Sequence, residues 1–174
     1  MDRLFAPWRI EWVERDEEPI DGCPFCVLPE RDDRESRIVA RNDGAFVLLN
    51  NYPYNPGHVM VIPERHTGAY EELDEDELLA HARLKQRTLG ALSAALGADG
   101  VNAGMNLGGA AAGGSIDDHL HEHVVPRWTG DTNFMPVVGD TKVIVEALDR
   151  TYDRLQEAFA DQAGATAGDG AVRF

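Results

Sequence analysis

The chain has 174 residues, of which 43% are apolar, and its 16 Lys and Arg face 31 Asp and Glu, giving a formal charge of −15. This length suits one globular domain with its own core, so a chain that is disordered throughout is excluded. The acidic balance also argues against nonspecific nucleic-acid binding, which draws its affinity from clustered Lys and Arg.

No apolar run is long enough for a membrane span, and the first residues lack a secretory signal pattern, so we expect a cytoplasmic protein with no membrane contact. The acidic residues are dispersed along the chain rather than gathered in a tail. Concentrated salt screens their repulsion to within about 3 Å at 1 M. We therefore expect a halophilic source; the alternative is an ordinary acidic protein.

The first half of the chain predicts short strands followed by a long helix. Residues 37–41 and 44–50 read as two strands joined by an Asp-Gly hairpin turn at 42–44, and residues 58–63 as a third strand. Between 74 and 96, leucines and alanines recur at helical spacing, and a glycine follows at 97. This segment is predicted to be the longest helix, with His81 as a solvent-exposed helical residue.

The second half predicts a strand at 101–107, a Gly-rich loop at 108–115, a strand at 119–128 and a helix at 141–160. Hairpin strands and two segregated helices indicate an α+β fold with a mainly antiparallel sheet. Residues 1–160 should form a single domain. The segment 161–174 is rich in Gly and Ala with little apolar surface, which predicts a flexible tail.

Three of the six histidines stand at alternate positions, His119, His121 and His123. A strand places such residues on one face, about 6.5 to 7 Å apart. Imidazoles this close repel each other when protonated, so the pattern indicates a functional role. One interpretation is a catalytic metal with an open position for water. The other is a neutral imidazole that attacks phosphorus and forms a phosphoramidate. The Gly-rich loop favours phosphorus chemistry, because its backbone N–H groups can surround an anion.

At these residues the sequence resembles the histidine triad (HIT) family of nucleotidyl hydrolases and transferases. The triad is read in His119-Leu120-His121-Glu122-His123-Val124-Val125, and a second signature at 50–63 contains the turn Pro56-Gly57-His58. The resemblance covers about 23–128, and the extension 129–160 is similar to the branch of diadenosine tetraphosphate phosphorylases. It implies a HIT-like fold, adenosine nucleotide or dinucleoside polyphosphate substrates, a homodimer and no organic cofactor.

The resemblance also implies individual roles. His121 would be the nucleophile, His123 would contact the phosphoryl oxygens or the leaving side, and His58 would help to bind the phosphate. The remaining substrate-binding positions are Asn50 for the ribose and Asn106, Gly114 and Ser115 for phosphate. Asn50 and His58 could instead be turn residues, and Asn106 a cap at a strand end. Ser115 stands where many hydrolases of the family have Gln, and Glu122 is charged where an apolar residue is usual.

Both cysteines lie in Cys23-Pro24-Phe25-Cys26. A single C-x-x-C can be half of a zinc site, a redox pair or a coincidence. Some histidine triad proteins and the related galactose-1-phosphate uridylyltransferases complete such a pair with two histidines, which match His66 and His119 here. The resemblance thus implies a closed, structural Zn²⁺ site. The alternative is two reduced thiols packed as small hydrophobes.

The sequence therefore predicts an enzyme that cleaves adenylyl-polyphosphate compounds through a nucleotidyl-histidine intermediate, with water or phosphate as acceptor. Arg127 or Lys142 could neutralise phosphoryl charge, although Arg127 could equally form a surface ion pair. Two alternatives stay open: a nucleotide-binding or sensing module without turnover, and a zinc hydrolase that uses the three triad histidines as metal ligands.

Overall fold

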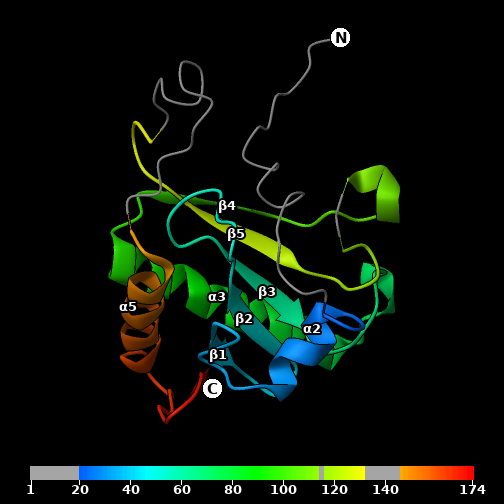
Figure 1. Cartoon of the computed structure of the whole chain (residues 1–174), viewed down its shortest axis with the longest axis horizontal. Coiled ribbons are helices and arrows are strands. Elements are labelled where there is room, and N and C mark those ends of the chain that lie inside the picture. Colours follow the sequence, from blue (N-terminus) through cyan, green and yellow to red (C-terminus); the bar gives the residue numbers. More distant parts are fainter. Residues whose placement is uncertain (1–19, 114–115, 132–145) are drawn as a thin grey trace.

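The computed structural model describes residues 20–113, 116–131 and 146–174. A six-stranded sheet in the order β4-β5-β3-β2-β1-β6 forms its centre (Figure 1). The strands are β1 (Ile38–Arg41), β2 (Ala45–Leu49), β3 (Val59–Pro63), β4 (Gly100–Gly104), β5 (Glu122–Arg127) and β6 (Val172–Arg173). The α-helices are α2 (Pro24–Val27), α3 (Glu75–Leu96) and α5 (Leu148–Ala160), and single 3-10 turns span Leu28–Glu30, Tyr70–Glu72 and Gly109–Ala112.

The predicted α+β class is confirmed. Strand pairs β1–β2, β2–β3, β3–β5 and β4–β5 are antiparallel, whereas β1–β6 is parallel. The predicted hairpin between β1 and β2 is present, and the Asn42 side chain accepts hydrogen bonds from the backbone N–H groups of Gly44 and Ala45. No helix within the described ranges has the length and apolar character needed to cross a bilayer.

Helix α3 has the limits that its end signals predict. The Asp74 side chain accepts from the Glu77 N–H while the Glu77 carboxylate accepts from the Asp74 N–H, which is a complete capping box. At the other end Gly97 adopts a left-handed conformation with φ of 63°. The predicted start of the last helix at 141 lies outside the described residues, and α5 itself begins at Leu148.

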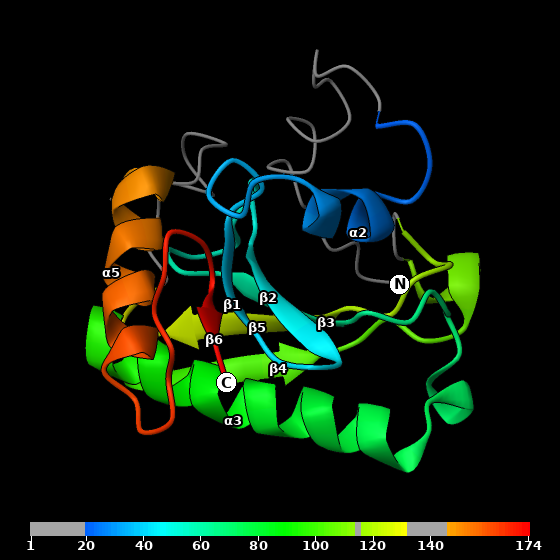
Figure 2. The same cartoon turned by 90° about the horizontal axis from the view of Figure 1, so that it is seen from below.

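The sheet is buried on both faces, because α3 and α2 lie on opposite sides of it (Figure 2). Val47, Leu49 and Val61 belong to the core that α3 and α5 cover. Phe46 and Ile62, which alternate with them, pack in a second cluster with Phe25 of α2. Two covered faces explain why β2 and β3 are apolar at every position instead of alternating with polar residues.

The prediction of a flexible tail at 161–174 is wrong. β6 pairs with β1 in register Ala40↔Val172, and the Phe174 N–H donates to the carbonyl of Arg41. Val172 is fully buried. A strand of two residues is stable here because it pairs with the edge of a sheet that the rest of the chain forms. The composition of the tail does not reveal this pairing.

The last long strand is shorter than predicted. β5 begins at Glu122, not at residue 119. The backbone N–H of Leu120 donates to the carbonyl of Thr67, so the chain is held there by a loop and not by a neighbouring strand. His119 and His121 therefore lie just before the strand, and only His123 is part of it.

Candidate active site and metal centre

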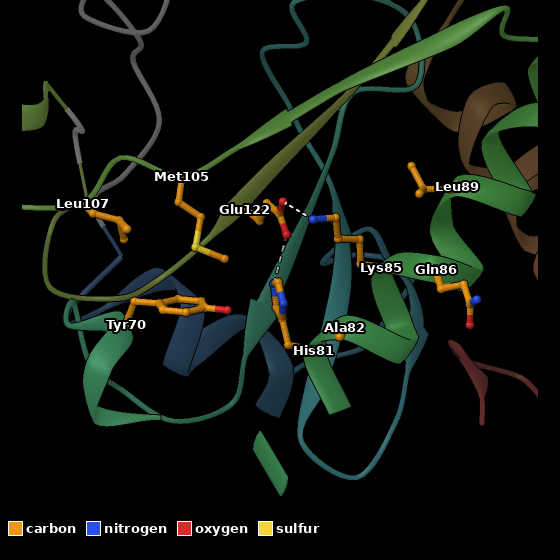
Figure 3. A pocket seen from close by; sticks show the side chains of 9 residues that line it. All are labelled: Tyr70, His81, Ala82, Lys85, Gln86, Leu89, Met105, Leu107 and Glu122. Carbon is orange, nitrogen blue, oxygen red and sulfur yellow. Dashed lines mark hydrogen bonds and ion pairs between the residues drawn. The ribbon is translucent and has the colours of Figure 1, made fainter. Parts of the chain in front are cut away.

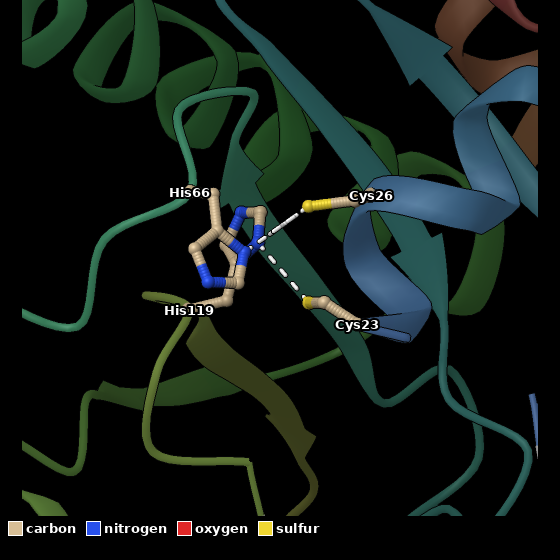
Figure 4. Close-up of side chains that lie close together, drawn as sticks. All are labelled: Cys23, Cys26, His66 and His119. Carbon is tan, nitrogen blue, oxygen red and sulfur yellow. Dashed lines mark hydrogen bonds between the residues drawn. The ribbon is translucent and has the colours of Figure 1, made fainter. Parts of the chain in front are cut away.

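Four side chains from three separate segments converge on one point (Figure 4). Cys23 and Cys26 come from the start of α2, His66 follows β3, and His119 precedes β5. One potential ligand atom of each lies within 4.8 Å of all the others. Two sulfurs and two imidazole nitrogens suit the tetrahedral coordination of Zn²⁺. The four residues predicted as ligands are thus together and could hold a metal ion.

The orientation of the two imidazoles suits ligation. His119 Nε2 lies 2.9 Å from the carbonyl oxygen of Pro63 and donates to it, which leaves Nδ1 facing the Cys23 Sγ at 3.4 Å. His66 Nδ1 lies 3.2 Å from the Cys26 Sγ, and its Nε2 lies 3.7 Å from a carboxylate oxygen of Asp118. Carbonyl and carboxylate partners behind the ring commonly orient metal-binding histidines.

The protonation equilibria of this group also fit metal binding. Burial lowers the pKa of His119, which favours the neutral imidazole that a metal requires. Desolvation, with Cys23 adding to it, raises the pKa of the Cys26 thiol. A cation is then what would stabilise the thiolate form. Four protein ligands would fill a tetrahedral shell, so a metal ion held here would have no open position for a water nucleophile.

A backbone hydrogen bond selects the tautomer of neutral His121. Its Nδ1 lies 2.9 Å from the backbone carbonyl oxygen of His119, and a carbonyl can only accept a hydrogen bond, so Nδ1 carries the proton. When this mostly buried imidazole is neutral, Nε2 is therefore the nitrogen without a proton. This is the form that a histidine needs for attack on an electrophile.

Phe25 packs against His121 and was not predicted as a site residue from the sequence. Its buried ring lies 5.1 Å from the His121 ring and 5.5 Å from the His119 ring, centroid to centroid. The only available signal was an aromatic residue between the two cysteines. Because Phe25 lies between Cys23 and Cys26 in the chain, the segment with the two cysteines packs directly against His121.

His58 and His123 form a second hydrogen-bonded pair beside His121. The backbone N–H of Tyr54 donates to His58 Nδ1 at 3.1 Å, so the proton of His58 lies on Nε2. That Nε2 lies 2.9 Å from His123 Nδ1, which must accept, and the His123 proton is therefore on its Nε2. The His121 and His123 rings are 5.0 Å apart. A lone pair on the His121 ring would suit nucleophilic attack, and an N–H on the neighbouring His123 ring would suit protonation of a leaving group.

The three triad histidines do not share one environment. His121 and His123 lie together with His58, whereas the side chain of His119 belongs to the group with the cysteines. Among the described residues, the metal-binding group contains neither His121 nor His123. This division favours a histidine nucleophile over a metal bound by the whole triad.

The predicted substrate-binding positions are only partly described. Asn50 directly follows β2, and its side-chain oxygen accepts from the Tyr52 N–H at 2.8 Å, as a turn residue does. Asn106 is exposed, two residues beyond β4. Gly114 and Ser115 lie outside the described residues, as does Lys142.

Arg127 forms an ion pair, one of the two roles considered for it. Its guanidinium donates to the Asp131 carboxylate through Nε at 2.6 Å and Nη2 at 2.8 Å. It also donates to the side-chain oxygen of Asn102 at 2.8 Å. This bidentate pair holds the pKa of Asp131 well below its usual range.

Glu122, which is charged where an apolar residue is usual, has two partners on α3. It lies on the face of β5 opposite His123, where Lys85 Nζ of α3 contacts one oxygen at 2.6 Å and His81 Nε2 lies 3.5 Å from the other (Figure 3). The prediction that His81 is solvent-exposed is wrong, since only 4% of it is accessible. His81 lies on the face of α3 that packs against the sheet.

Stability should fall in mild acid because of His81. Burial, the largest effect, and Lys85 lower its pKa, while Glu122 opposes them, so the folded state binds this proton less readily than the unfolded chain. The contribution of His81 to the free energy of unfolding is fully present above about pH 6.5. Below that pH it decreases by up to about 1.4 kcal/mol per pH unit. Urea unfolding at pH 7.5 and 5.5 should show a smaller pH dependence for His81→Gln than for the parent. An equal change in the free energy of unfolding between the two pH values for both proteins would contradict this role of His81.

Comparisons with known proteins agree with this geometry. A family model described as HIT domain matches residues 31–130. The chain is 38% identical over 169 residues to an AP-4-A phosphorylase of Mycobacterium tuberculosis, covering 93% of this chain and 86% of that protein.

Two solved structures are similar. A Zn-bound histidine triad family protein from Mycobacterium smegmatis has a TM-score of 0.65 and 26% identity, with 80% of this chain and 94% of that one covered. A hypothetical histidine triad nucleotide-binding protein from Sulfolobus tokodaii has a TM-score of 0.61 and 32% identity, with 79% and 89% covered. Together with the triad and the Cys₂His₂ group in one fold, these matches show that the chain belongs to the HIT domain family.

Proposed function

We propose that this chain cleaves a phosphoanhydride bond of adenylyl-polyphosphate compounds, such as diadenosine tetraphosphate, through a nucleotidyl-His121 intermediate. As a HIT family member similar to an AP-4-A phosphorylase, it is a nucleotidyl hydrolase or phosphorylase. The observation that carries the covalent step is the hydrogen bond from His121 Nδ1 to the His119 carbonyl, because it places the lone pair of the neutral imidazole on Nε2.

In the first step, His121 Nε2 attacks the α-phosphorus, a P–N bond forms, and the P–O bond to the rest of the polyphosphate breaks. The Nε2–H of His123 lies on the neighbouring ring and supplies the proton to the leaving oxygen. In the second step, water or inorganic phosphate attacks the same phosphorus and breaks the P–N bond. From diadenosine tetraphosphate, water gives AMP and ATP, whereas phosphate gives ADP and ATP.

The acceptor is phosphate in the reaction that we favour, because the similarity to an AP-4-A phosphorylase extends over most of both chains. The purified protein in high salt should be incubated with diadenosine tetraphosphate, with and without inorganic phosphate, and the nucleotides resolved. ADP and ATP that appear only with phosphate support phosphorolysis. AMP and ATP regardless of phosphate indicate hydrolysis, and binding without any product would favour a sensing module.

Asn50, Asn106, Gly114 and Ser115 are proposed to contact the substrate, and His58 to act beside the phosphate. The metal-binding group is proposed to hold structural Zn²⁺, with Cys23, Cys26, His66 and His119 as its ligands. Bound there, the ion would supply structural stability, because the four protein ligands complete a tetrahedron.

A second copy of the chain is the proposed partner at the free edge of the sheet. Within the described ranges no strand pairs with the outer side of β4, whose sequence Gly-Val-Asn-Ala-Gly carries neither charge nor proline to discourage pairing. Beside it lies a groove of about 540 Å³ (Figure 3). Tyr70, Leu89 and Leu107 on its rim are 41%, 38% and 49% exposed. Antiparallel pairing of two β4 strands around a twofold axis would cover both features.

Two substitutions on helix α3 test the proposed dimer. Light scattering should give about twice the chain mass of 19.1 kDa for the parent protein. Leu89→Asp places a charge on the groove and should give monomers. Leu79→Asp is the matched control, since Leu79 is also exposed on α3 but does not line the groove. A parent protein that is monomeric at 100 times the assay concentration would contradict the proposal.

A further inference from the structure

The loop that carries His58 is tied to the end of β5 through one side chain. The Asn55 amide nitrogen donates to the Pro126 carbonyl at 2.9 Å and to the Asp131 carboxylate at 3.0 Å. Asp131 is itself held by the bidentate Arg127 and by the backbone N–H of Trp128. Asn55, Arg127 and Asp131 are called the latch below.

The latch acts on the residue next to it, Tyr54. The Tyr54 ring stacks on His58 with centroids 4.6 Å apart and planes 28° apart, and it lies 5.8 Å from His123 at 27°. Its backbone N–H donates to His58 Nδ1. Tyr54 therefore determines two properties of the histidine pair at once. The ring restricts the planes of both imidazoles, and the N–H selects which nitrogen of His58 bears the proton.

The other end of this loop has little freedom to compensate for a change in the latch. Gly57 has φ of +80°, a conformation that other residues rarely adopt, and a Cβ there would meet the Leu96 side chain. The turn is thus packed against the end of α3. The Asn55 side chain holds the segment between this packed turn and β5, so its loss should move Tyr54 rather than the whole loop.

We propose that Tyr54, held by the latch, is a positioning residue for His58 and His123. This inference rests on the proposed function, in which His123 protonates the leaving oxygen. With Tyr54 in place, His58 donates from Nε2 to His123 Nδ1, and the His123 proton is directed to Nε2. When Tyr54 moves, His58 can exchange tautomers, and His123 spends part of its time without a proton on the nitrogen that needs one.

The test uses four variants of the full chain. Asn55→Ala and Asp131→Asn loosen the latch, Tyr54→Leu removes the stacking ring, and Tyr54→Phe retains both the ring and the backbone N–H. Asp153→Asn is the matched control, because it breaks another Arg–Asp pair, with Arg34 at 2.8 Å, on α5. The kinetic readout is kcat and KM with diadenosine tetraphosphate, and the structural readout is the ¹⁵N chemical shifts of the His58 and His123 rings.

We expect kcat to fall about 10- to 100-fold for Asn55→Ala and Tyr54→Leu, with KM changed less than about threefold. Asp153→Asn should stay near the parent, and Tyr54→Phe should lose less kcat than Tyr54→Leu. In the parent the ¹⁵N shifts should show single tautomers with protons on Nε2 of both rings, and in the two impaired variants they should move toward a tautomer mixture. Asp131→Asn keeps the shape of the side chain, so it tests the latch if Asn55→Ala fails to fold.

Unchanged kcat and unchanged ¹⁵N shifts in folded Asn55→Ala and Asp131→Asn would overturn the latch and leave the proposed function standing. Failure of the proposed function has a different signature, namely full turnover by His121→Ala. A parent spectrum with a tautomer mixture at His58 would overturn the positioning role whatever the kinetics show.

Discussion

Replacement of His121 by alanine is expected to lower kcat for diadenosine tetraphosphate by about 10⁴-fold or more, the scale of losing a catalytic nucleophile. The reason is local. In the described structure the His121 Nδ1 donates to a backbone carbonyl, so in the neutral imidazole Nε2 is the nitrogen that we propose attacks phosphorus. Nucleotide binding should persist, because the substitution removes no charge when the imidazole is neutral. Product formation by chromatography and binding by calorimetry separate the two effects.

The covalent intermediate provides the direct measurement. Rapid acid-free quenching of the parent protein, followed by digestion and mass spectrometry, should recover an adenylylated peptide that contains His121. His81→Gln is a suitable control, since His81 lies on the helix-covered side of the sheet behind β5. Turnover by His121→Ala at the parent rate, or an adenylyl group on another residue, would refute the assignment.

Loss of the metal-binding group is expected to have the second large effect. A metal present at about 1,000 times its dissociation constant contributes about 4 kcal/mol to the free energy of unfolding. For a chain of this length that corresponds to a decrease in Tm of about 8 to 16 °C. Cys23→Ser should therefore lose bound zinc, measured by elemental analysis, and should unfold at a correspondingly lower temperature in calorimetry.

Activity should also fall in Cys23→Ser. The backbone carbonyl of His119 orients His121, and Phe25 from the cysteine segment packs against the His121 ring. Release of His119 and of that segment would loosen both constraints. Asp118→Asn is the graded control, because an outer partner of a ligand such as His66 typically changes affinity 10- to 100-fold without abolishing binding. Cys23→Ser protein with unchanged Tm and zinc content would contradict the site.

The two sites thus share one short segment of chain. His119 offers its ring to the metal-binding group and its carbonyl to His121.

Local signals in the sequence determined the elements whose ends are set by neighbouring residues. The Asp74 and Glu77 capping box and the Gly97 stop fixed α3 at both limits. The alternating histidines and the paired cysteines predicted where polar chemistry would gather. These patterns are readable because a cap, a turn or a ligand pair depends on residues a few positions apart.

Tertiary structure decided the properties that depend on which surfaces meet. Leu79 and Leu89 match the helical spacing of α3 yet remain exposed, whereas His81 is buried because Glu122 of β5 lies opposite it. The pairing of β6 with β1 and the stacking of Tyr54 on His58 join segments that neither periodicity nor composition connects. A sequence pattern reports that a helix has an apolar side, but the direction of that side is set by the partner it packs against.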